Sequence, residues 1–359
     1  MANDMAKRDL LIELGTEELP PKALPDLSAA LTEELVRQLD DAGLAHGAVE
    51  SFAAPRRLAV LVRDLADKQA DRQVERLGPA LQAAYDADGK PTKAAEGFAA
   101  SVGLSVDQLD RRDTDKGERL FAQLTEAGRP TVELVPDFLA QAVNKLPIPK
   151  RMRWGRRKVQ FVRPVHWLVA LYGSDVIDFE LLDQRAGRTS RGHRFHAPDA
   201  IELSEAGDYA TRLEQDGKVI ADFPRRREMI RQQAEQAGRD AGGQAHLDED
   251  LLDEVTALVE WPVALAGRFD DDFLRVPQEA LITAMEEHQK YFPVLDANGK
   301  LTPHFITISN IESRDPQKVI AGNEKVIRPR LADAAFFYDN DCRKPLEQHA
   351  QGLAQVVFQ

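Results

Sequence analysis

A stripe of five leucines near the N-terminus most constrains how this chain folds. The leucines recur every three or four residues, as on one face of a helix: Leu24, Leu27, Leu31, Leu35 and Leu39. Short apolar runs at 9–14 and 58–63 flank this helix and are typical of strands. Because an apolar stripe must pack against another element, the sequence predicts a strand–helix–strand unit over residues 1–65.

Apolar periodicity along the rest of the chain predicts an α+β fold in which antiparallel hairpins are flanked by helices. We expect hairpins at 166–182 and 291–309 and further strands at 119–127 and 263–268. Helices are expected at 92–102, at 133–146, from Asp222 to Gly238, at 249–259, from Pro277 onward and from about 315 to the end.

Breaks between these elements divide the chain into four predicted units. The first covers residues 1–65, and the second is a small α+β unit at 66–147, where a proline ends a helix. A central basic α+β domain is expected at 148–312. Residues 313–359 are expected to begin a helical domain.

The composition is that of a globular protein, with 43% hydrophobic and 30% charged residues. No run approaches the roughly 20 apolar residues of a membrane-spanning helix, and the first ten residues lack the apolar core of a signal peptide. The single Cys342 excludes an internal disulfide and a multi-cysteine metal site. These features predict a cytoplasmic protein without membrane contact.

A basic segment lies within an acidic chain. The formal net charge is −13, which taken alone argues against a nonspecific nucleic-acid binder. Residues 150–231, however, hold 17 Lys and Arg residues against 12 Asp and Glu residues. Because salt screens such fields within roughly 8 Å, a local basic patch can bind an anion whatever the total charge.

Six of the nine residues from Lys150 to Lys158 are cationic, and Trp154 lies in the middle. Two prolines before this segment place it on an exposed loop, and Arg163 extends its charge. RNA needs cations for its phosphates and planar groups on which its bases stack. The segment therefore predicts contact with RNA or phosphate. The alternative is a solvated turn with Trp154 packed on the core.

Two further arginine clusters allow both functional and structural interpretations. The first cluster has an arginine at every third position, namely Arg185, Arg188, Arg191 and Arg194. For this cluster, contact with phosphate and ion pairs within the protein are equally open. His193 and His196 lie inside it, but no third ligand of clear spacing accompanies them, so we favour histidines packed in a loop over a metal site. The second arginine cluster lies on a predicted helix and consists of Arg225, Arg226, Arg227 and Arg231. For this cluster we favour a solvated helix face over a binding surface.

The sequence lacks the common self-contained catalytic motifs. It has no phosphate-binding loop, no dinucleotide fingerprint, no H-E-x-x-H zinc motif and no G-x-S-x-G elbow. Glu17 and Glu18 follow a strand, and a role at a helix entry is favoured over acid–base chemistry because no partner group is identifiable. We therefore predict no catalytic residue and no metal site.

Eight segments, in order along nearly the whole chain, carry a resemblance to a known family. They are ELGTEELPP (13–21), PRRLAV (55–60), KRMRWG (150–155), FVRPVHWLVAL (161–171), GHRFH (192–196), EVTALVEWPVALAGRFD (254–270), VPQEALITAMEEHQKYFPV (276–294) and GNEKVIRPRLADAAFFYDND (322–341). On these segments the chain resembles the β subunit of the bacterial two-subunit glycyl-tRNA synthetase.

The resemblance implies that the chain binds tRNA-Gly, while a separate α subunit binds ATP with Mg and activates glycine in an α2β2 assembly with a second β subunit. It implies no cofactor on this chain. The family's β subunit is longer, and its later part holds a helical HD-like domain, so residues 313–359 resemble the start of that domain. The earlier part is similar to a region of the phenylalanyl-tRNA synthetase β chain that edits misacylated tRNA there.

The resulting hypothesis is a non-catalytic, tRNA-binding and scaffolding subunit of glycine–tRNA ligase. The residues expected to contact RNA are Lys150, Arg151, Arg153, Trp154, Arg156, Arg157, Lys158, Arg163, Arg188, Arg191 and Arg194. One alternative is an editing-type hydrolase of mischarged aminoacyl-tRNA that uses Glu17, His193 and His196, although no hydrolytic constellation is evident. The other is a pure subunit-interaction scaffold without RNA contact.

Overall fold

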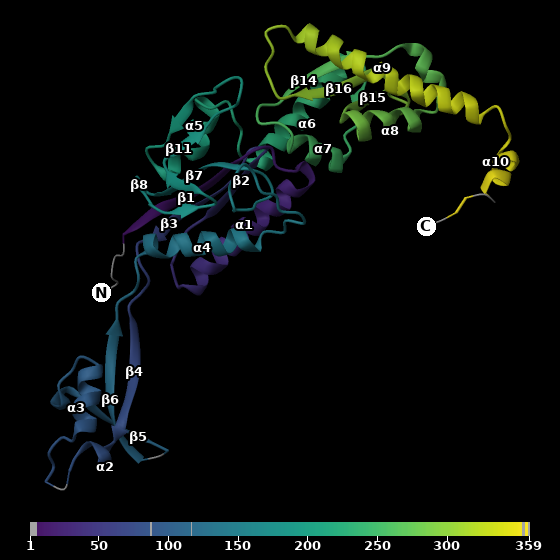
Figure 1. Cartoon of the computed structure of the whole chain (residues 1–359). Helices are drawn as coiled ribbons and strands as arrows, with labels where there is room; N and C mark the ends of the chain where they lie inside the picture. Colours follow the sequence, from purple (N-terminus) through teal and green to yellow (C-terminus); the bar gives the residue numbers. More distant parts are fainter. Residues whose placement is uncertain (1–5, 87, 116, 354–355, 358–359) are drawn as a thin grey trace. The chain divides into compact units, whose positions relative to one another are not determined.

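The computed structural model describes residues 6–86, 88–115, 117–353 and 356–357, and Figure 1 shows their helices and strands. The chain forms two compact units. The larger comprises Asp9–Glu34, Gly47–Arg63 and Ala140–Gln359, and the smaller comprises Met1–Arg8, Leu35–His46 and Asp64–Leu139. No helix of the described residues is long and apolar enough to cross a lipid bilayer.

The first part of the larger unit is built on a seven-stranded sheet. Its strands are, in spatial order, β2 (Val49–Ala54), β3 (Arg57–Ala66), β1 (Lys7–Thr16), β7 (Val165–Tyr172), β10 (Gln184–Gly187) and β9 (Glu180–Leu181), with β8 (Asp175–Val176) paired to β7. Strands β1 and β7 are antiparallel, whereas β7 and β10 are parallel. This order places the N-terminal strand beside the strand that follows the basic segment.

One face of this sheet packs against helix α5 (Tyr209–Gln215) and strand β12 (Ala200–Glu202), which pairs with β11 (Thr189–Arg191). Tyr209 and Leu213 of α5 join Leu11, Leu61 and Val169 of the sheet in one buried cluster. Because successive side chains of a strand point to opposite faces, every second residue of β1 and β7 is available to this core.

A four-stranded antiparallel sheet with helices on both faces forms the later part of the larger unit. Its strands are, in order, β13 (Gln244–Ala245), β15 (Phe292–Leu295), β16 (Leu301–Ser309) and β14 (Val263–Arg268). The helices are α6 (Phe223–Asp240) and α7 (Glu249–Thr256) on one face, and α8 (Gln278–Gln289) and α9 (Pro316–Asp341) on the other. Neighbouring residues of β16 serve the two cores, Phe305 with α8 and α9 and Ile306 with α6 and α7.

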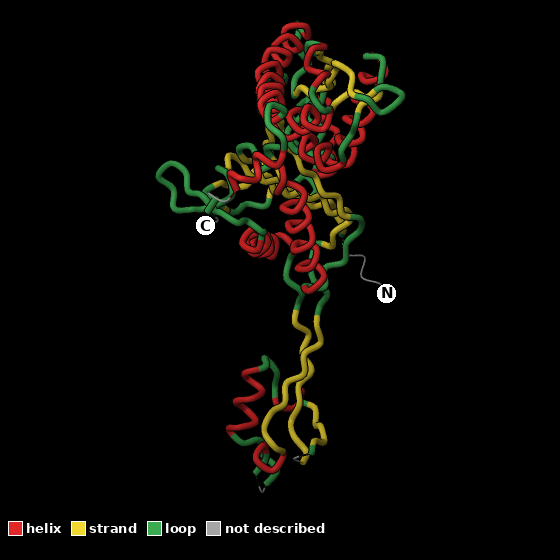
Figure 2. Tube along the Cα trace, turned by 90° about the vertical axis from the view of Figure 1, so that its right-hand side faces the viewer, coloured by secondary structure: helices red, strands yellow, loops and turns green. Residues whose placement is uncertain are grey.

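The smaller unit contains a three-stranded antiparallel sheet in the order β4 (Arg72–Ala80), β6 (Gly117–Glu126) and β5 (Asp110–Thr114). Strands β4 and β6 form a long two-stranded ribbon, with α2 (Leu81–Ala84) and α3 (Lys93–Ser101) near one end of it (Figure 2). A small core of Ala84, Ala95 and Leu120 holds this end together.

Two long helices contribute residues to both units, α1 (Leu24–Asp41) and α4 (Thr131–Lys145). Helix α10 (Leu346–Leu353) follows α9. The described residues also include the short 3-10 helices η1 (Pro21–Ala23), η2 (Val106–Gln108), η3 (Ala206–Asp208) and η4 (Asp271–Arg275).

The predicted α+β class, with antiparallel sheets and flanking helices, is confirmed. The strand predicted at 263–268 is β14 itself. At the start of α6, the Asp222 side chain accepts a hydrogen bond of 2.9 Å from the Arg225 N–H, as the predicted N-cap requires. The division of the chain into four units stays a prediction.

The hairpin predicted at 166–182 is wrong in its second arm. Strand β8 ends after two residues, and residues 180–181 form β9, which pairs with β10 instead. Leu182 and Asp183 have positive φ angles of 54° and 57°, so the chain turns tightly between β9 and β10. Strands β2 and β4 were not predicted, and β4 is mostly exposed and lacks the apolar alternation of a half-buried strand.

Candidate nucleic-acid interface

The basic loop, which we define as residues 150–158, lies between α4 and β7 and is fixed at its base. Met152 and Phe161 exchange two backbone hydrogen bonds of 2.8 and 3.2 Å, and the Phe161 side chain is fully buried. Between them the chain reverses at Gly155, whose φ is +56°, and the Arg157 N–H donates to the Trp154 carbonyl. These bonds hold the loop as a short closed ribbon.

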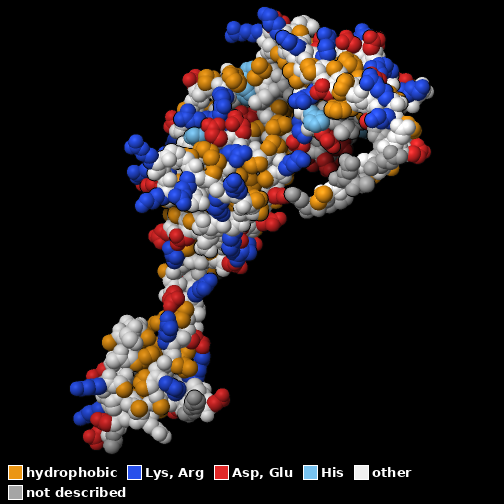
Figure 3. Space-filling view, turned by 45° about the vertical axis from the view of Figure 1, so that its right-hand side comes forward, with side chains coloured by type: hydrophobic (Ala, Val, Ile, Leu, Met, Phe, Trp, Pro, Cys, Tyr) orange, Lys and Arg blue, Asp and Glu red, His pale blue; other side chains and the backbone are white. Residues whose placement is uncertain are grey.

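Most cations of the basic loop point to solvent. The exposed ones, which have no carboxylate partner in the described part of the chain, are Lys150, Arg153, Arg156, Arg157 and Lys158. Trp154 is half-buried, so part of its side chain is accessible. Figure 3 shows one face of the molecule, on which lysine and arginine side chains are interspersed with carboxylates. Cations without an internal partner are free to neutralise an external anion.

Two other cations of the predicted set hold the flanks of the basic loop. The Arg151 guanidinium donates to the Asn144 carbonyl at 3.0 Å, in the last turn of α4, where the helix dipole favours positive charge. The Arg163 guanidinium donates at 3.1 Å to the carbonyls of Glu18 and Val162. Both side chains are half-buried, and their hydrogen bonds go to the backbone of the protein.

The predicted arginines beyond the loop differ in their contacts. Arg188 donates to the carbonyls of Ser174 at 2.9 Å and Leu203 at 3.3 Å. Arg194 pairs with Glu17 at 2.9 Å. Arg191 is exposed and forms no ion pair with the residues that the structure describes. Of these three, Arg191 alone keeps its guanidinium uncommitted within that part of the chain.

The arginine run of α6 is bound within the protein. Arg225 pairs with Glu214, and Arg227 and Arg231 pair with carboxylates of α7. Arg226 departs from the expected solvated face, because it is fully buried and donates to three backbone carbonyls, those of Ala53, Ile220 and Thr256. Burial lowers the pKa of Arg226 to about 9, although the charges of Glu260 and Asp222 oppose this shift.

Glu17, at the end of β1, is held by a cation and a histidine. The Arg194 guanidinium donates to one carboxylate oxygen at 2.9 Å, and His166 Nε2 lies 3.0 Å from the other. Burial alone would raise the pKa of Glu17, but the hydrogen bonds and charges of Arg194 and His166 outweigh burial and lower it. A carboxylate kept ionised in this way is a poor general base near neutral pH.

His193 and His196 are both engaged with the backbone. His193 Nδ1 accepts hydrogen bonds of 3.2 Å from the N–H groups of Phe195 and His196, and burial lowers the pKa of His193. His196 Nε2 accepts the Glu312 N–H at 3.0 Å. Among the residues that the structure describes, no group of three His, Cys, Asp or Glu side chains is arranged to hold a metal ion.

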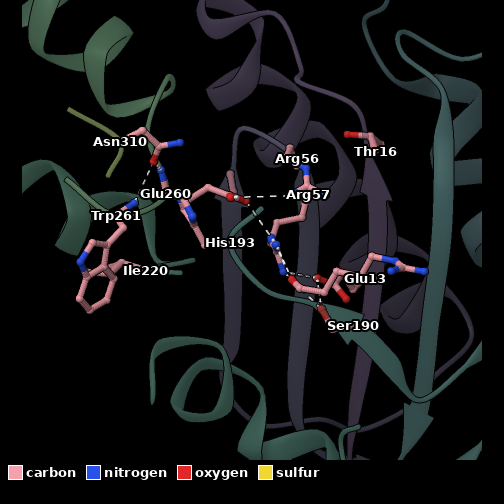
Figure 4. A network of polar contacts seen from close by, with 12 residues as sticks. Glu13, Thr16, Arg56, Arg57, Ser190, His193, Ile220, Glu260, Trp261 and Asn310 are labelled. Atoms are coloured by element: carbon pink, nitrogen blue, oxygen red, sulfur yellow. Dashed lines mark hydrogen bonds and ion pairs between the residues drawn. The ribbon is translucent and has the colours of Figure 1, made fainter. Parts of the chain in front are cut away.

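A buried polar network centres on Arg57, the first residue of β3 (Figure 4). Its guanidinium contacts Glu13 of β1 at 3.1 Å and Glu260 at 3.3 Å, and all three side chains are buried. Burial would lower the pKa of Arg57, but the charges of Glu260 and Glu13 raise it. The Asn310 side chain accepts the Glu260 N–H at 2.7 Å and so fixes Glu260 to the later part of the unit.

A family sequence model described as "Glycyl-tRNA synthetase beta subunit" matches residues 10–359 of the chain. The chain belongs to this family. Curated relatives named "Glycine--tRNA ligase beta subunit" include those of Marinobacter nauticus at 58% identity, Chromohalobacter salexigens at 56% and Klebsiella pneumoniae at 52%. Each alignment covers 99% of this chain and 51–52% of the relative, so the chain spans about half the length of the curated relatives it matches.

In this member of the glycyl-tRNA synthetase beta subunit family, sequence reasoning missed the Arg57 network entirely. Its members are far apart in the chain, since Arg57 is 44 positions after Glu13 and Glu260 is 203 positions after Arg57. One local signal was present, because Glu13 interrupts the otherwise apolar run of β1. A carboxylate inside a buried strand needs a partner, so this position could have predicted a buried cation.

Proposed function

We propose that this chain is a non-catalytic, tRNA-binding and scaffolding part of a glycine–tRNA ligase, which positions tRNA-Gly for ATP-dependent glycylation by a separate α subunit. The observation that carries the proposal is the basic loop, where exposed cations stand without carboxylate partners on a backbone fixed at Met152 and Phe161. The family membership supports glycylation of tRNA as the reaction to which this surface would contribute.

The charges of the basic loop fit an RNA backbone. Each phosphate that a Lys or Arg neutralises releases bound counterions, so binding weakens as salt rises. The other exposed arginines with ion pairs would first have to give up a carboxylate, as Arg225 would with Glu214. Exposed cations without such a partner bear no such cost, which supports Arg153, Arg156 and Arg157 as the strongest contacts in the predicted set.

Trp154 adds a planar group to this surface. Its side chain is half-buried, and it lies at the tight reversal between Arg153 and Arg156. An indole in this position suits an unpaired nucleotide, because bases stack on aromatic side chains whatever their sequence. The proposed contact is therefore an RNA backbone with one exposed base, as occurs near the acceptor end of a tRNA.

The proposed mechanism is positioning. A loop whose base is closed by two backbone hydrogen bonds loses little freedom when RNA binds. Holding the tRNA in one orientation lowers the entropic part of the barrier for a reaction at another subunit. The proposed partners are the α subunit, which would bind ATP with Mg, a second β subunit in an α2β2 assembly, and tRNA-Gly, all in the cytoplasm.

Two finer fold assignments belong to the same proposal. We infer that the seven-stranded sheet and its α5 layer correspond to the part of the phenylalanyl-tRNA synthetase β chain that the sequence resembles. We infer also that α9 and α10 begin a helical HD-like domain. An editing reaction is not proposed, because Glu17, His193 and His196 are each engaged in hydrogen bonds within the protein.

The test is a salt titration of tRNA-Gly binding by the chain, with an unrelated tRNA alongside. Replacing Arg156 and Arg157 by Ala should weaken binding and reduce the slope of log K against log salt by about one to two units. The matched control is Arg185→Ala with Arg225→Ala, which also removes two exposed charges, but ones paired with Asp178 and Glu214. An equal slope in the wild type and the loop variant contradicts the proposal.

Absence of tRNA binding at low salt would support the alternative scaffold without RNA contact. Equal binding to both tRNAs would place an RNA-contacting surface here but no selectivity for tRNA-Gly.

A further inference from the structure

Two half-buried arginines attach the basic loop to the rest of the larger unit, one on each side. Arg151 precedes Met152 and Arg163 follows Phe161 by two positions, so the two arginines flank the residue pair that closes the loop. Between them, the side chains at 153–158 form no hydrogen bond or ion pair with the part of the chain that the structure describes. The direction in which these side chains point therefore depends on how the flanks of the loop are held.

Arg151 holds the first flank to the end of α4. Its guanidinium donates to the Asn144 carbonyl at 3.0 Å and lies 3.5 Å from the Val143 carbonyl oxygen. The last carbonyls of a helix have no partner within the helix, so Arg151 supplies a donor that these two residues need. The connection between them contains Pro147 and Pro149, which restrict its backbone further.

Arg163 holds the second flank to the segment that follows β1. Its guanidinium donates at 3.1 Å to the Glu18 carbonyl and at 3.1 Å to the Val162 carbonyl. Beside it, the Glu17 N–H donates to the Pro164 carbonyl at 2.9 Å. The chain that leaves the loop is therefore fixed to the end of β1 through both a side chain and the backbone.

The surroundings of Arg151 are unfavourable for a phosphate. The C-terminal end of α4 carries the negative end of the helix dipole, and the guanidinium compensates this partial charge. An anion that contacted Arg151 would approach the same negative end and would compete with the helix carbonyls. Arg156 is exposed and pairs with no carboxylate of the described residues, so a phosphate that binds it displaces no internal partner.

We propose that Arg151 is a positioning residue of the basic loop. Its hydrogen bond to the end of α4 sets the direction in which Arg153, Arg156 and Arg157 are displayed, and Arg151 itself contacts no phosphate. Arg163 has the same role at the other flank. The inference rests on the proposed function, in which the displayed cations bind the tRNA backbone. A loop that is oriented before binding loses less freedom when RNA binds, so loss of Arg151 weakens binding without removing a phosphate contact.

The first experiment is a salt titration of tRNA-Gly binding by single variants of the chain. Arg151→Ala should raise Kd about fivefold at fixed salt while the slope of log K against log salt stays at the value of the unsubstituted chain. Arg156→Ala is the matched variant, because it removes a proposed phosphate contact and should lower the slope by about one. Arg185→Ala, which removes an exposed arginine paired with Asp178, should change neither quantity.

The second experiment measures hydrogen exchange of the free chain by mass spectrometry of peptides that cover residues 150–161. Arg151→Ala should speed exchange of the Met152 and Phe161 N–H groups about five- to tenfold, because the flank that supports their two hydrogen bonds is released. Arg151→Lys, whose ammonium can donate to the same helix carbonyls, should recover part of the protection and part of the affinity. Arg156→Ala should leave exchange unchanged. Equal thermal unfolding midpoints show that the fold is kept.

Three results overturn the positioning role. They are a salt slope that falls in Arg151→Ala as it does in Arg156→Ala, which makes Arg151 a phosphate contact, unchanged exchange at the base of the loop in Arg151→Ala, and faster exchange with an unchanged Kd. In each case the unsubstituted chain still binds tRNA-Gly, and the proposed function stands. If the unsubstituted chain binds no tRNA-Gly at low salt, the proposed function fails and the positioning role fails with it, so the two failures are distinguishable.

Discussion

The basic loop and the Arg57 network use the same side chain in opposite environments. Arg57 is fully buried, and its guanidinium contacts two buried carboxylates, Glu13 and Glu260. Arg156 and Arg157 are exposed and pair with no carboxylate of the described residues. The charge of Arg57 is used to hold the protein together, whereas the charges of the loop remain available to a ligand. The pairing of arginines, more than their number, therefore distinguishes those that hold the fold from those that are available to a ligand.

The largest predicted effect follows from removing Arg57, the buried arginine of this comparison. Arg57→Ala should lower the free energy of unfolding by about 3–5 kcal/mol, because it leaves Glu13 buried without a cation and Glu260 with only Arg56, 3.9 Å away. Urea unfolding followed by circular dichroism measures this change. Arg156→Ala is the matched control, since removing an exposed arginine should alter the unfolding free energy by no more than about 0.5 kcal/mol. Similar losses in both variants would contradict the comparison.

Arg226 sharpens the comparison, because it is buried among carbonyls and not carboxylates. Its guanidinium binds the backbone of β2, of α7 and of residue 220. Arg226→Ala should cost roughly 1–3 kcal/mol of unfolding free energy, because buried carbonyls lose their donors but no buried charge is left behind. The same urea experiment checks it. A loss as large as that of Arg57→Ala would show that the carboxylates are not what makes Arg57 special.

Sequence patterns located the elements that bury a regular apolar face. The run at 263–268 predicts β14 correctly, because a short apolar run between polar segments has few other conformations. Strand β4 escaped prediction because its ladder with β6 is mostly exposed and carries polar side chains, so backbone pairing and not burial defines it. Local periodicity contains no information about such a pairing partner.

For the candidate site, too, sequence patterns predict one part correctly and leave another part undetermined. The exposure of the basic loop follows from the prolines before it, and the sequence predicted this correctly. The sequence did not separate Arg191, which forms no ion pair with described residues, from Arg194, which pairs with Glu17 and Glu18. That difference depends on Arg194 lying beside the end of β1, because Glu17 is 177 positions away from it in the chain. Whether these arginines bind RNA stays a prediction.

The smallest predicted effect concerns the pair of Glu17 and Arg194, which lies between the two extremes. Partial burial would raise the pKa of Glu17, but the hydrogen bond and charge of Arg194 keep this pKa below its ordinary value. A carboxylate whose pKa is lowered on folding stabilises the protein fully above its unfolded pKa, near 4.3, and this contribution is lost as the pH falls through the folded pKa. Acid should therefore remove a little stability through this pair.

Arg194→Ala should raise the pKa of Glu17 toward its ordinary value and so reduce the loss of stability between pH 7 and pH 3. The change should be small, because both side chains are partly exposed and water screens the pair. Thermal unfolding at several pH values measures it, with Arg191→Ala as the control that removes an exposed arginine without an ion pair. If both variants keep the wild-type pH dependence, the ion pair of Arg194 contributes no more to stability than the unpaired cations of the basic loop.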